Sequence, residues 1–413
     1  MATHITNATQ LQAINSDLTA DYILDNDIDL TGVTWTPIGL AGDGFEGTFD
    51  GQNFTIRNLT LAGTASNDPV GLFAVITGQI SNLNLSNFVI TLDSVFGAGG
   101  LVGSLSDEAI ITNCHISGIT ITDSVLSQAI GGLIGIIDTW VLTQTDVTIE
   151  NCSAEDVAIT TSFSHTIGGL IGNKVPSSTD TKGLTINKCF STGAVISSMN
   201  TIANYGGFFG ICEDATVTNC YSHVNVTVGN AVFHVSGFFG YMDQCDVSKC
   251  YSSGAIVTGT NCYEIGGFIG AFHEDALDPP IHLLNCYSVS SITTGSGNQS
   301  TGGFIGFIDH NLSLNSSTII NCSWYTGAST YAIGFYDDTG VNGPVATLSE
   351  LSWGTDETVN TDFYSKTHVV YDQGNANAWD FASGDMWYEH ADRYPDFVGD
   401  GGGPWRTLLG VGF

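Results

Sequence analysis

The chain has 413 residues and carries 41 acidic against 8 basic residues, which gives a formal net charge of −33. That sign argues against a nucleic-acid-binding surface and disfavours anionic lipid or strongly acidic glycan as a partner. The charge either keeps an elongated particle soluble through mutual repulsion or reflects adaptation to high salt, which screens it.

No apolar run approaches the length of a membrane span, so we expect no insertion into a membrane. The first residues lack the basic and apolar regions of a secretory signal. Two interpretations follow: a signal has been removed and Met1 is vector-derived, or the protein reaches the outside by a route that needs no signal.

The first 62 residues do not repeat, and we expect an N-terminal cap and the first coils there. Residues 5–14 predict a short helix with polar N-cap candidates, which suits a lid over an open end of a stack. Residues 22–30 and 54–61 largely alternate apolar and polar side chains, a pattern typical of half-buried strands. Glycines at turn positions lie between them, in residues 35–39 and 45–51.

Residues 63–335 contain a five-residue motif that recurs at intervals of roughly 30 residues, usually two glycines, two apolar residues and a third glycine. Its copies are residues 99–103, 131–135, 168–172, 206–210, 236–240, 266–270 and 302–306. A period of this length predicts a solenoid, in which each repeat forms one coil.

Seven of the ten cysteines keep the same register as the motif. They are Cys114, Cys152, Cys189, Cys220, Cys250, Cys286 and Cys322. The distance from each cysteine to the second glycine of the next motif is 17 or 18 residues, whereas the distance from that glycine to the next cysteine varies from 13 to 20. The constant arm predicts stacked strands, and the variable arm predicts an external loop.

We expect the seven cysteines to stack as small buried hydrophobes with free thiols, made in a reducing compartment. The sequence has no Cys-x-x-Cys pair, so a zinc knuckle is not expected, and we predict no metal and no cofactor. Cys212, Cys245 and Cys262 fall outside the register, and whether any two of them pair stays open.

A bend is predicted just before each of the seven cysteines. An aliphatic residue stands three positions before each one, and that spacing cannot keep both side chains on one face of a straight strand. The intervening corner is asparagine at five of the seven sites and lysine at Lys188 and Lys249. Asparagine tolerates the backbone angles of such a corner. We therefore expect coils of three short strands, with backbone hydrogen bonds running between coils.

The order of short motifs in residues 11–59, including Trp-x-Pro-Ile-Gly and Phe-x-Gly-Thr-Phe-Asp-Gly, followed by the Gly-Gly-Leu-Ile-Gly repeats, resembles the GLUG-repeat proteins. That family occurs in bacterial surface adhesins, in accessory regions of secreted peptidases and in phage-encoded proteins. The resemblance covers about residues 5–395. It implies an all-β chain, a right-handed parallel β-helix with N- and C-terminal caps.

Two further segments follow the repeats. Residues 336–398 end in aromatic residues around Trp379, Trp387 and Tyr394 that resemble the terminal cap of GLUG proteins. Residues 399–413 form a glycine-rich hinge and an apolar tail. The tail either docks onto another subunit of a larger assembly or packs against its own cap.

The first candidate binding site is a strip of aromatic residues directly after four of the cysteines. These residues are Phe190, Tyr221, Tyr251 and Tyr287. If each cysteine points inward, the next residue points outward, and exposed aromatic rings bind sugar faces or partner subunits. The alternative is a stacking ladder that only stabilises the coils.

The second candidate is the set of long loops in the variable arm, because insertions in repeats often mark the binding face. They bring Trp140 in the first loop, His273 in the third and His310 in the fourth. The third loop adds carboxylates to His273, but without a known ligand spacing this does not indicate a metal site. Ordinary solvated loops are the alternative.

The sequence therefore favours a non-catalytic, surface-displayed adhesin or receptor-binding solenoid, part of a virus or phage particle as tail fibre, spike or decoration. Its expected partners are a host-surface glycan or receptor and, through the tail, other subunits of the particle, and a homo-oligomer is compatible with the sequence. The alternatives are a glycan-cleaving β-helix enzyme and an architectural spacer. Acidic pairs are easy to nominate among 41 acids, but no catalytic motif is present.

Overall fold

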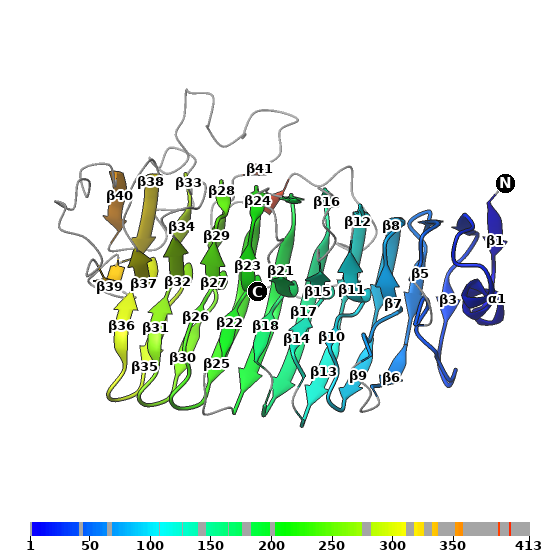
Figure 1. Ribbon diagram of the computed structural model, residues 1–413, viewed down its shortest axis with the longest axis horizontal. Helices are drawn as coiled ribbons and strands as arrows, with labels where there is room; N and C mark the ends of the chain where they lie inside the picture. Colours follow the sequence, from blue (N-terminus) through cyan, green and yellow to red (C-terminus); the bar gives the residue numbers. More distant parts are fainter. Residues whose placement is uncertain are drawn as a thin grey trace.

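The computed structural model describes residues 2–40, 44–63, 68–106, 108–125, 127–138, 146–163, 165–175, 183–198, 203–274, 282–310, 318–325, 333–337, 352–357, 387–388 and 396–397. These residues form a parallel β-helix whose coils stack along the long axis of the molecule (Figure 1). The fold predicted from the repeat is confirmed.

The N-terminal end of the stack carries the helix, at the right of Figure 1. Helix α1 (Ala8–Ala13) continues into a 3₁₀ turn, η1 (Ile14–Ser16), which confirms the predicted helix. The Oδ1 atom of Asn7 caps α1 by accepting a hydrogen bond from the backbone N–H of Gln10. Leu11 and Ile14 are buried against the first coils, so the helix covers the apolar end of the solenoid.

Short strands follow the helix and already belong to the stack. They are β2 (Tyr22–Leu24), β3 (Ile28–Asp29), β4 (Thr48–Asp50), β5 (Thr55–Arg57) and β6 (Thr60–Ala62), with β1 (Thr3–Ile5) paired to β2. Because β4 and β5 both pair with β8 (Gln79–Ser86), the N-terminal segment is continuous with the repeats.

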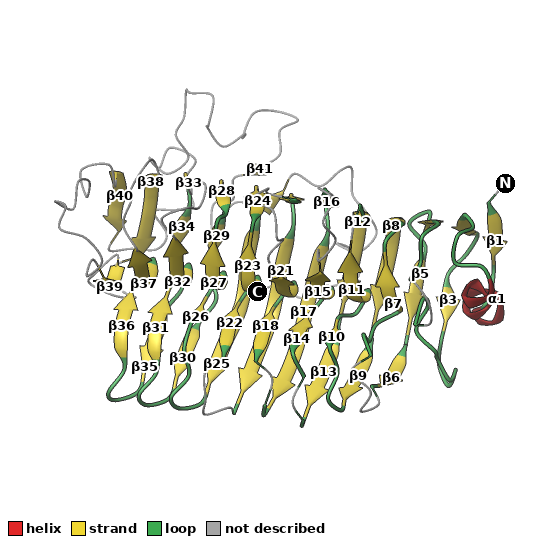
Figure 2. Cartoon of the chain, viewed as in Figure 1, coloured by secondary structure: helices red, strands yellow, loops and turns green. Residues whose placement is uncertain are grey.

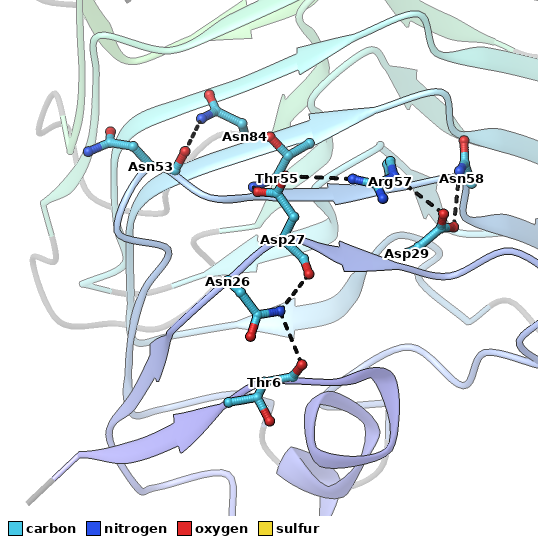
Figure 3. A network of polar contacts seen from close by, with 9 residues as sticks. All are labelled: Thr6, Asn26, Asp27, Asp29, Asn53, Thr55, Arg57, Asn58 and Asn84. Carbon is cyan, nitrogen blue, oxygen red and sulfur yellow. Dashed lines mark hydrogen bonds and ion pairs between the residues drawn. The ribbon is translucent and has the colours of Figure 1, made fainter. Parts of the chain in front are cut away.

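Polar side chains link these first coils along one edge (Figure 3). Arg57 lies 3.6 Å from Asp27 and its Nε donates to Asp29 over 3.3 Å. Thr31 and Asn58 also donate to Asp29, and these hydrogen bonds hold the pKa of its carboxyl well below the usual range. Asn26 donates to the carbonyl oxygen of Thr6 and so joins this edge to the cap.

Each repeat contributes strands to three sheets. The nine-stranded sheet comprises β7 (Phe73–Ile76), β11 (Val102–Ser106), β15 (Ile134–Asp138), β19 (Ile171–Val175), β23 (Phe209–Glu213), β27 (Phe239–Asp243), β32 (Ile269–Glu274), β37 (Ile305–His310) and β39 (Ile333–Asp337). The seven-stranded sheet comprises β10 (Gly97–Ala98), β14 (Ala129–Gly131), β18 (Thr166–Gly168), β22 (Asn204–Gly206), β26 (Val235–Ser236), β31 (Tyr263–Gly266) and β36 (Gln299–Gly302).

The third sheet has 24 strands and wraps round two sides of the coil. Besides β1–β6 and β8 it comprises β9 (Val89–Leu92), β12 (Ile110–Ser117), β13 (Thr120–Asp123), β16 (Val147–Glu150), β17 (Ser153–Thr161), β20 (Leu184–Asn187), β21 (Phe190–Ser197), β24 (Ala215–Thr218), β25 (Tyr221–Val228), β28 (Asp246–Ser248), β29 (Tyr251–Ser252), β30 (Ile256–Thr258), β33 (His282–Leu284), β34 (Tyr287–Ser288), β35 (Ile292–Thr294), β38 (Thr318–Tyr325) and β40 (Ser352–Glu357). Strands β41 (Trp387–Tyr388) and β42 (Asp396–Phe397) form a separate antiparallel pair. In Figure 2 the described chain is almost all strand (yellow) and loop or turn (green), with helix (red) only near the N-terminus.

The predicted corner is confirmed before six of the seven cysteines; for Asn321, the seventh, no backbone angle is described. The backbone φ angle is +52° at Asn113, +51° at Asn151 and +55° at Asn219, and the two lysines at this corner, Lys188 and Lys249, also have φ of +55°. The corner at Asn113 bends strand β12, whereas the corners from Asn151 to Asn285 each lie between two strands of the large sheet. The asparagine side chains bond from coil to coil, as in the 2.9 Å bond from Asn151 Nδ2 to Asn113 Oδ1.

Like residues lie above like residues inside the solenoid. Ile111 pairs with Ile149, which pairs with Ile186, and the seven cysteines of the register are all buried and free. The backbone N–H of Cys189 lies 3.4 Å from the sulfur of Cys220 in the next coil. Phe208 and Phe238 stack with ring centroids 4.4 Å apart. The interior is thus one continuous apolar core.

The first glycine of the five-residue motif is required by a close backbone approach. A Cβ atom on Gly206 would lie 1.8 Å from the carbonyl oxygen of Phe209, and one on Gly266 would lie 1.7 Å from that of Ile269. No side chain fits there, because the chain folds sharply between the seven- and nine-stranded sheets at this point.

Several predicted features lie outside the described residues: the long loops of the variable arm, the predicted C-terminal cap apart from three short strands, and the tail at 399–413. Among the residues that are described, no helix is long and apolar enough to cross a membrane.

Candidate functional site

The four predicted aromatic residues do form one column. Phe190 and Tyr221 stack with centroids 4.8 Å apart and an 8° interplanar angle, and Tyr251 and Tyr287 stack at 4.8 Å and 3°. Tyr221 and Tyr251 complete the column at 5.2 Å. The Oη of Tyr251 also lies 3.2 Å from Nε2 of His223.

The prediction that this column is an exposed strip is wrong for its three tyrosines. Tyr221 is 6% exposed, and Tyr251 and Tyr287 are 0% exposed, whereas Phe190 is half-buried. A sugar binds to the face of an aromatic ring, but here both faces of Tyr221 and Tyr251 are covered by the rings of adjacent coils. The column therefore stabilises the stack, which is the alternative that the sequence left open.

The structure bears differently on the three residues predicted to lie in long loops. Trp140 lies outside the described residues, and for His310 only the backbone at the end of β37 is described. His273 is not in a loop: it lies near the end of β32, is half-buried, and has its Nδ1 3.8 Å from Oδ2 of Asp243. Within the described part of the chain, no group of three or more metal-ligating side chains is arranged around a common point.

His273 belongs to a group of charged side chains that the sequence analysis missed. We call it the polar corner; it consists of Lys174, Glu213, Asp214, Asp243 and His273. The group lies at the ends of four adjacent strands of the nine-stranded sheet, β19, β23, β27 and β32. Register places Glu213 beside Asp243 and Asp243 beside His273.

Two members of the polar corner lie in the interior. The side chain of Lys174 is 1% exposed and that of Asp214 is 4% exposed, with Nζ and Oδ2 3.9 Å apart. Leu105 and Ile137 occupy the position of Lys174 in the two preceding coils. A lysine in an apolar column is the signal that could have identified this group from the sequence, since only 8 basic residues are present.

The carboxyl of Glu213, in the polar corner, is a weaker acid than an ordinary glutamic acid. Burial, together with the neighbouring charge of Asp243, raises the pKa of Glu213 to about 7. A carboxyl whose pKa lies near neutral pH can both donate and accept a proton. Next to it, the sulfur atoms of Cys212 and Cys245 are 3.5 Å apart, and both thiols are free and buried.

A second feature absent from the sequence analysis is an exposed, uncharged face on the large sheet. Its outer row consists of Ala62, Thr91, Thr122, Thr160, Ile196, Thr227, Val257 and Thr293, each in register with the next. Ile196 is 47% exposed and Val257 39%. Beside it runs the inner row Thr60, Val89, Thr120, Ala158, Ala194 and Asn225. We call the two rows together the threonine face.

The threonine face is regular, because each row keeps its register from coil to coil. Successive coils of a parallel sheet lie about 4.8 Å apart, so the rows present hydroxyl and methyl groups at that interval along the axis. No residue of either row carries a charge, in a chain with 41 acidic residues. In Figure 1 the strands that carry this face, from β6 to β35, lie side by side along one edge of the molecule.

Comparison with known proteins agrees with this architecture. A family model described as the GLUG motif matches residues 94–122, which span the glycine motif of β10–β11 and the first cysteine corner. The chain carries a GLUG motif there. The later coils keep the same spacing of glycines and cysteines.

Halomucin of Haloquadratum walsbyi is 30% identical to the chain over 151 residues, a match that covers 32% of this chain and 2% of halomucin. A solved Bacteroides ovatus protein provisionally named an immunoglobulin A1 protease has 23% identity and a TM-score of 0.50, and the match covers 72% of this chain and 83% of that one. An IgA1 protease structure aligns with a TM-score of 0.40 and 17% identity over 74% of this chain and 21% of that one. The Bacteroides likeness shows a shared β-helix fold, and the match to halomucin reaches a small part of that protein.

Proposed function

We propose that this GLUG-repeat solenoid is a non-catalytic, surface-displayed adhesin that binds a neutral glycan through the threonine face. The observation that carries the proposal is the exposure of two uncharged rows along a molecule of net charge −33. An uncharged, partly apolar face kept in contact with water on an otherwise acidic protein is typical of a binding surface.

The chemistry of the threonine face suits a sugar. Each threonine offers a hydroxyl that donates and accepts hydrogen bonds and a methyl group that packs against the C–H face of a pyranose. The acidic remainder of the molecule repels acidic polymers, so the glycan is neutral. Because the threonines project from a hydrogen-bonded sheet, little conformational freedom is lost on binding.

Display on a virus or phage particle belongs to the same proposal. All ten cysteines are buried and free, which is compatible with synthesis in the reducing interior of a host cell before release. Attachment to other particle subunits is assigned to residues 399–413, which lie outside the described residues.

The proposal is tested by binding to an immobilised panel of neutral polysaccharides and oligosaccharides. A double variant, Thr122→Glu with Thr160→Glu, places two carboxylates in the outer row and should weaken binding about tenfold or more. Thr185→Glu adds one carboxylate at an exposed position of β20, outside the threonine face, and should bind like the unchanged protein. Binding that survives the double variant, or no binding across the panel, would remove the proposal.

A glycan-cleaving enzyme is the second candidate function, favoured by one observation. Glu213, whose pKa is raised to about 7 by burial and by Asp243, lies beside Asp243, and a carboxyl with a raised pKa next to a second carboxyl is an arrangement used for general acid catalysis. Release of reducing sugar from the same panel, lost in Glu213→Gln, would establish it. No release from any glycan would leave the adhesin.

A further inference from the structure

The buried pair in the polar corner is held by a fixed backbone. Lys174 is on β19, and Asp214 directly follows β23, the next strand of the nine-stranded sheet. Asp214 has a backbone φ of +51°, and its N–H donates to the carbonyl oxygen of Asp243 over 3.2 Å. The turn therefore holds the Asp214 carboxyl against the Lys174 ammonium of the preceding coil.

Lys174 and Asp214 lie side by side away from water. Separate charges in an apolar interior lose hydration, and their mutual attraction compensates only with good geometry and further hydrogen bonds. The 3.9 Å separation between Nζ and Oδ2 is longer than a charge-assisted hydrogen bond. A proton passed from the ammonium to the carboxylate would leave an amine beside a carboxylic acid, which are the two reactants of amide formation.

We propose that Lys174 and Asp214 condense to an intramolecular isopeptide bond that joins two successive coils. The Nζ lone pair attacks Cγ of the protonated Asp214, and a C–N bond forms. The C–O bond to the hydroxyl then breaks, and that hydroxyl leaves with a proton from nitrogen as water. One amine and one carboxylic acid become one amide and one water, so no oxidant or cofactor takes part.

Glu213 is the residue that moves the proton. It precedes Asp214 in the chain, and its ionisation responds to the charges of Lys174, Asp214, Asp243 and His273. Its carboxylate accepts the proton from the attacking nitrogen, and its carboxylic acid then delivers it to the departing hydroxyl. The pKa of Glu213, raised to about 7, suits a group that takes up a proton and returns it near neutral pH.

The bond would covalently link the coil of β19 to the coil of β23. Stacked coils are otherwise held by backbone hydrogen bonds and side-chain packing, which can be pulled apart one coil at a time. A covalent link between Lys174 and Asp214 closes a loop in the unfolded chain and so opposes fraying at this point, as a disulfide does. It would do so without using any of the buried thiols.

The test is the intact mass of the reduced, denatured full-length chain, followed by peptide mapping. We expect a mass lower than that of the sequence by one water molecule, and a branched peptide that joins Lys174 Nζ to Asp214 Cγ. Lys174→Arg should restore the full mass. Asp214→Asn should lose ammonia in place of water, because the leaving group changes.

Two controls make the test specific. Lys188→Arg changes a lysine at a coil corner and should keep the missing water. Glu213→Gln, compared with the unchanged chain at the same time after synthesis, should contain a smaller cross-linked fraction. A full mass in the unchanged chain would overturn the proposal. So would a missing water that persists in Lys174→Arg, since that marks a cyclic imide at an aspartate. These masses do not depend on glycan binding.

Discussion

At the scale of single residues, the cysteine corners show how a backbone angle selects a side chain. Asn113, Asn151 and Asn219 adopt positive φ and bond to the amide of a neighbouring coil, whereas Lys188 and Lys249 hold the same angle without a side chain suited to it. A left-handed angle is unfavourable for most residues but accessible to asparagine. The two lysine corners are therefore weak points of the stack.

Replacing Lys249 with asparagine should raise the free energy of unfolding by about 0.5–1 kcal/mol, because asparagine relieves the positive-φ strain at that corner. Lys249→Gln is the matched control: it also removes the charge but keeps an ordinary side chain, and should gain little. Chemical denaturation of the three proteins measures the effect. Equal stabilisation by both substitutions would assign it to charge and contradict the account.

The raised pKa of Glu213 predicts that the free energy of unfolding depends on pH. Its pKa is raised from 4.5 to about 7 by burial and by Asp243, so between these values the folded chain keeps a proton that the unfolded chain has released. This contribution to stability is complete below pH 4.5 and is lost as pH rises through 7, by at most about 3 kcal/mol. In Glu213→Gln this loss should be absent when unfolding is followed from pH 4.5 to 8. The same slope in both proteins would contradict the assignment.

At the scale of elements, the five-residue glycine motif makes the turn between the seven- and nine-stranded sheets. Gly206→Ala places a Cβ atom 1.8 Å from the carbonyl oxygen of Phe209, and the backbone must move to relieve it. We expect a loss of about 1–3 kcal/mol in the free energy of unfolding. Gly32→Ala is the control, since its Cβ meets no atom within 4 Å and only its φ of +72° is unfavourable, at about 1 kcal/mol. A smaller loss at Gly206 than at Gly32 would argue against the close approach.

The elements that the sequence predicted are those that repeat. The glycine motif, the cysteine register and the asparagine corner each recur coil after coil, so one pattern fixed the strand order and the columns. Features that do not repeat were not predicted. Lys174 occurs in an apolar column only once, and its partner Asp214 is 40 residues away in the sequence. The burial of Tyr251 was also not predicted. The sequence pattern indicates that its side chain points away from the core, but not whether neighbouring side chains cover it.

At the scale of the whole molecule, every structural assignment depends on coils that stack in register. The threonine face exists because positions separated by one repeat lie above one another, and the polar corner exists because four strands end together. Strictly parallel pairing within the three large sheets makes the molecule grow in one direction, so its length increases with each coil. The thiols are enclosed along the same axis.

The increase in length with each coil is measured most directly by distances between pairs of spin labels along the outer row of the threonine face. Cysteines introduced at the exposed positions Thr160, Thr122 or Thr91, each paired with one at Thr293, are four, five and six coils apart. The ten native cysteines are buried and should stay unlabelled in the folded chain, which labelling of the unsubstituted protein checks. We predict distances that rise in equal steps of about 4.8 Å per coil. Unequal steps, or distances that do not rise from Thr160 to Thr91, would contradict the stacked solenoid.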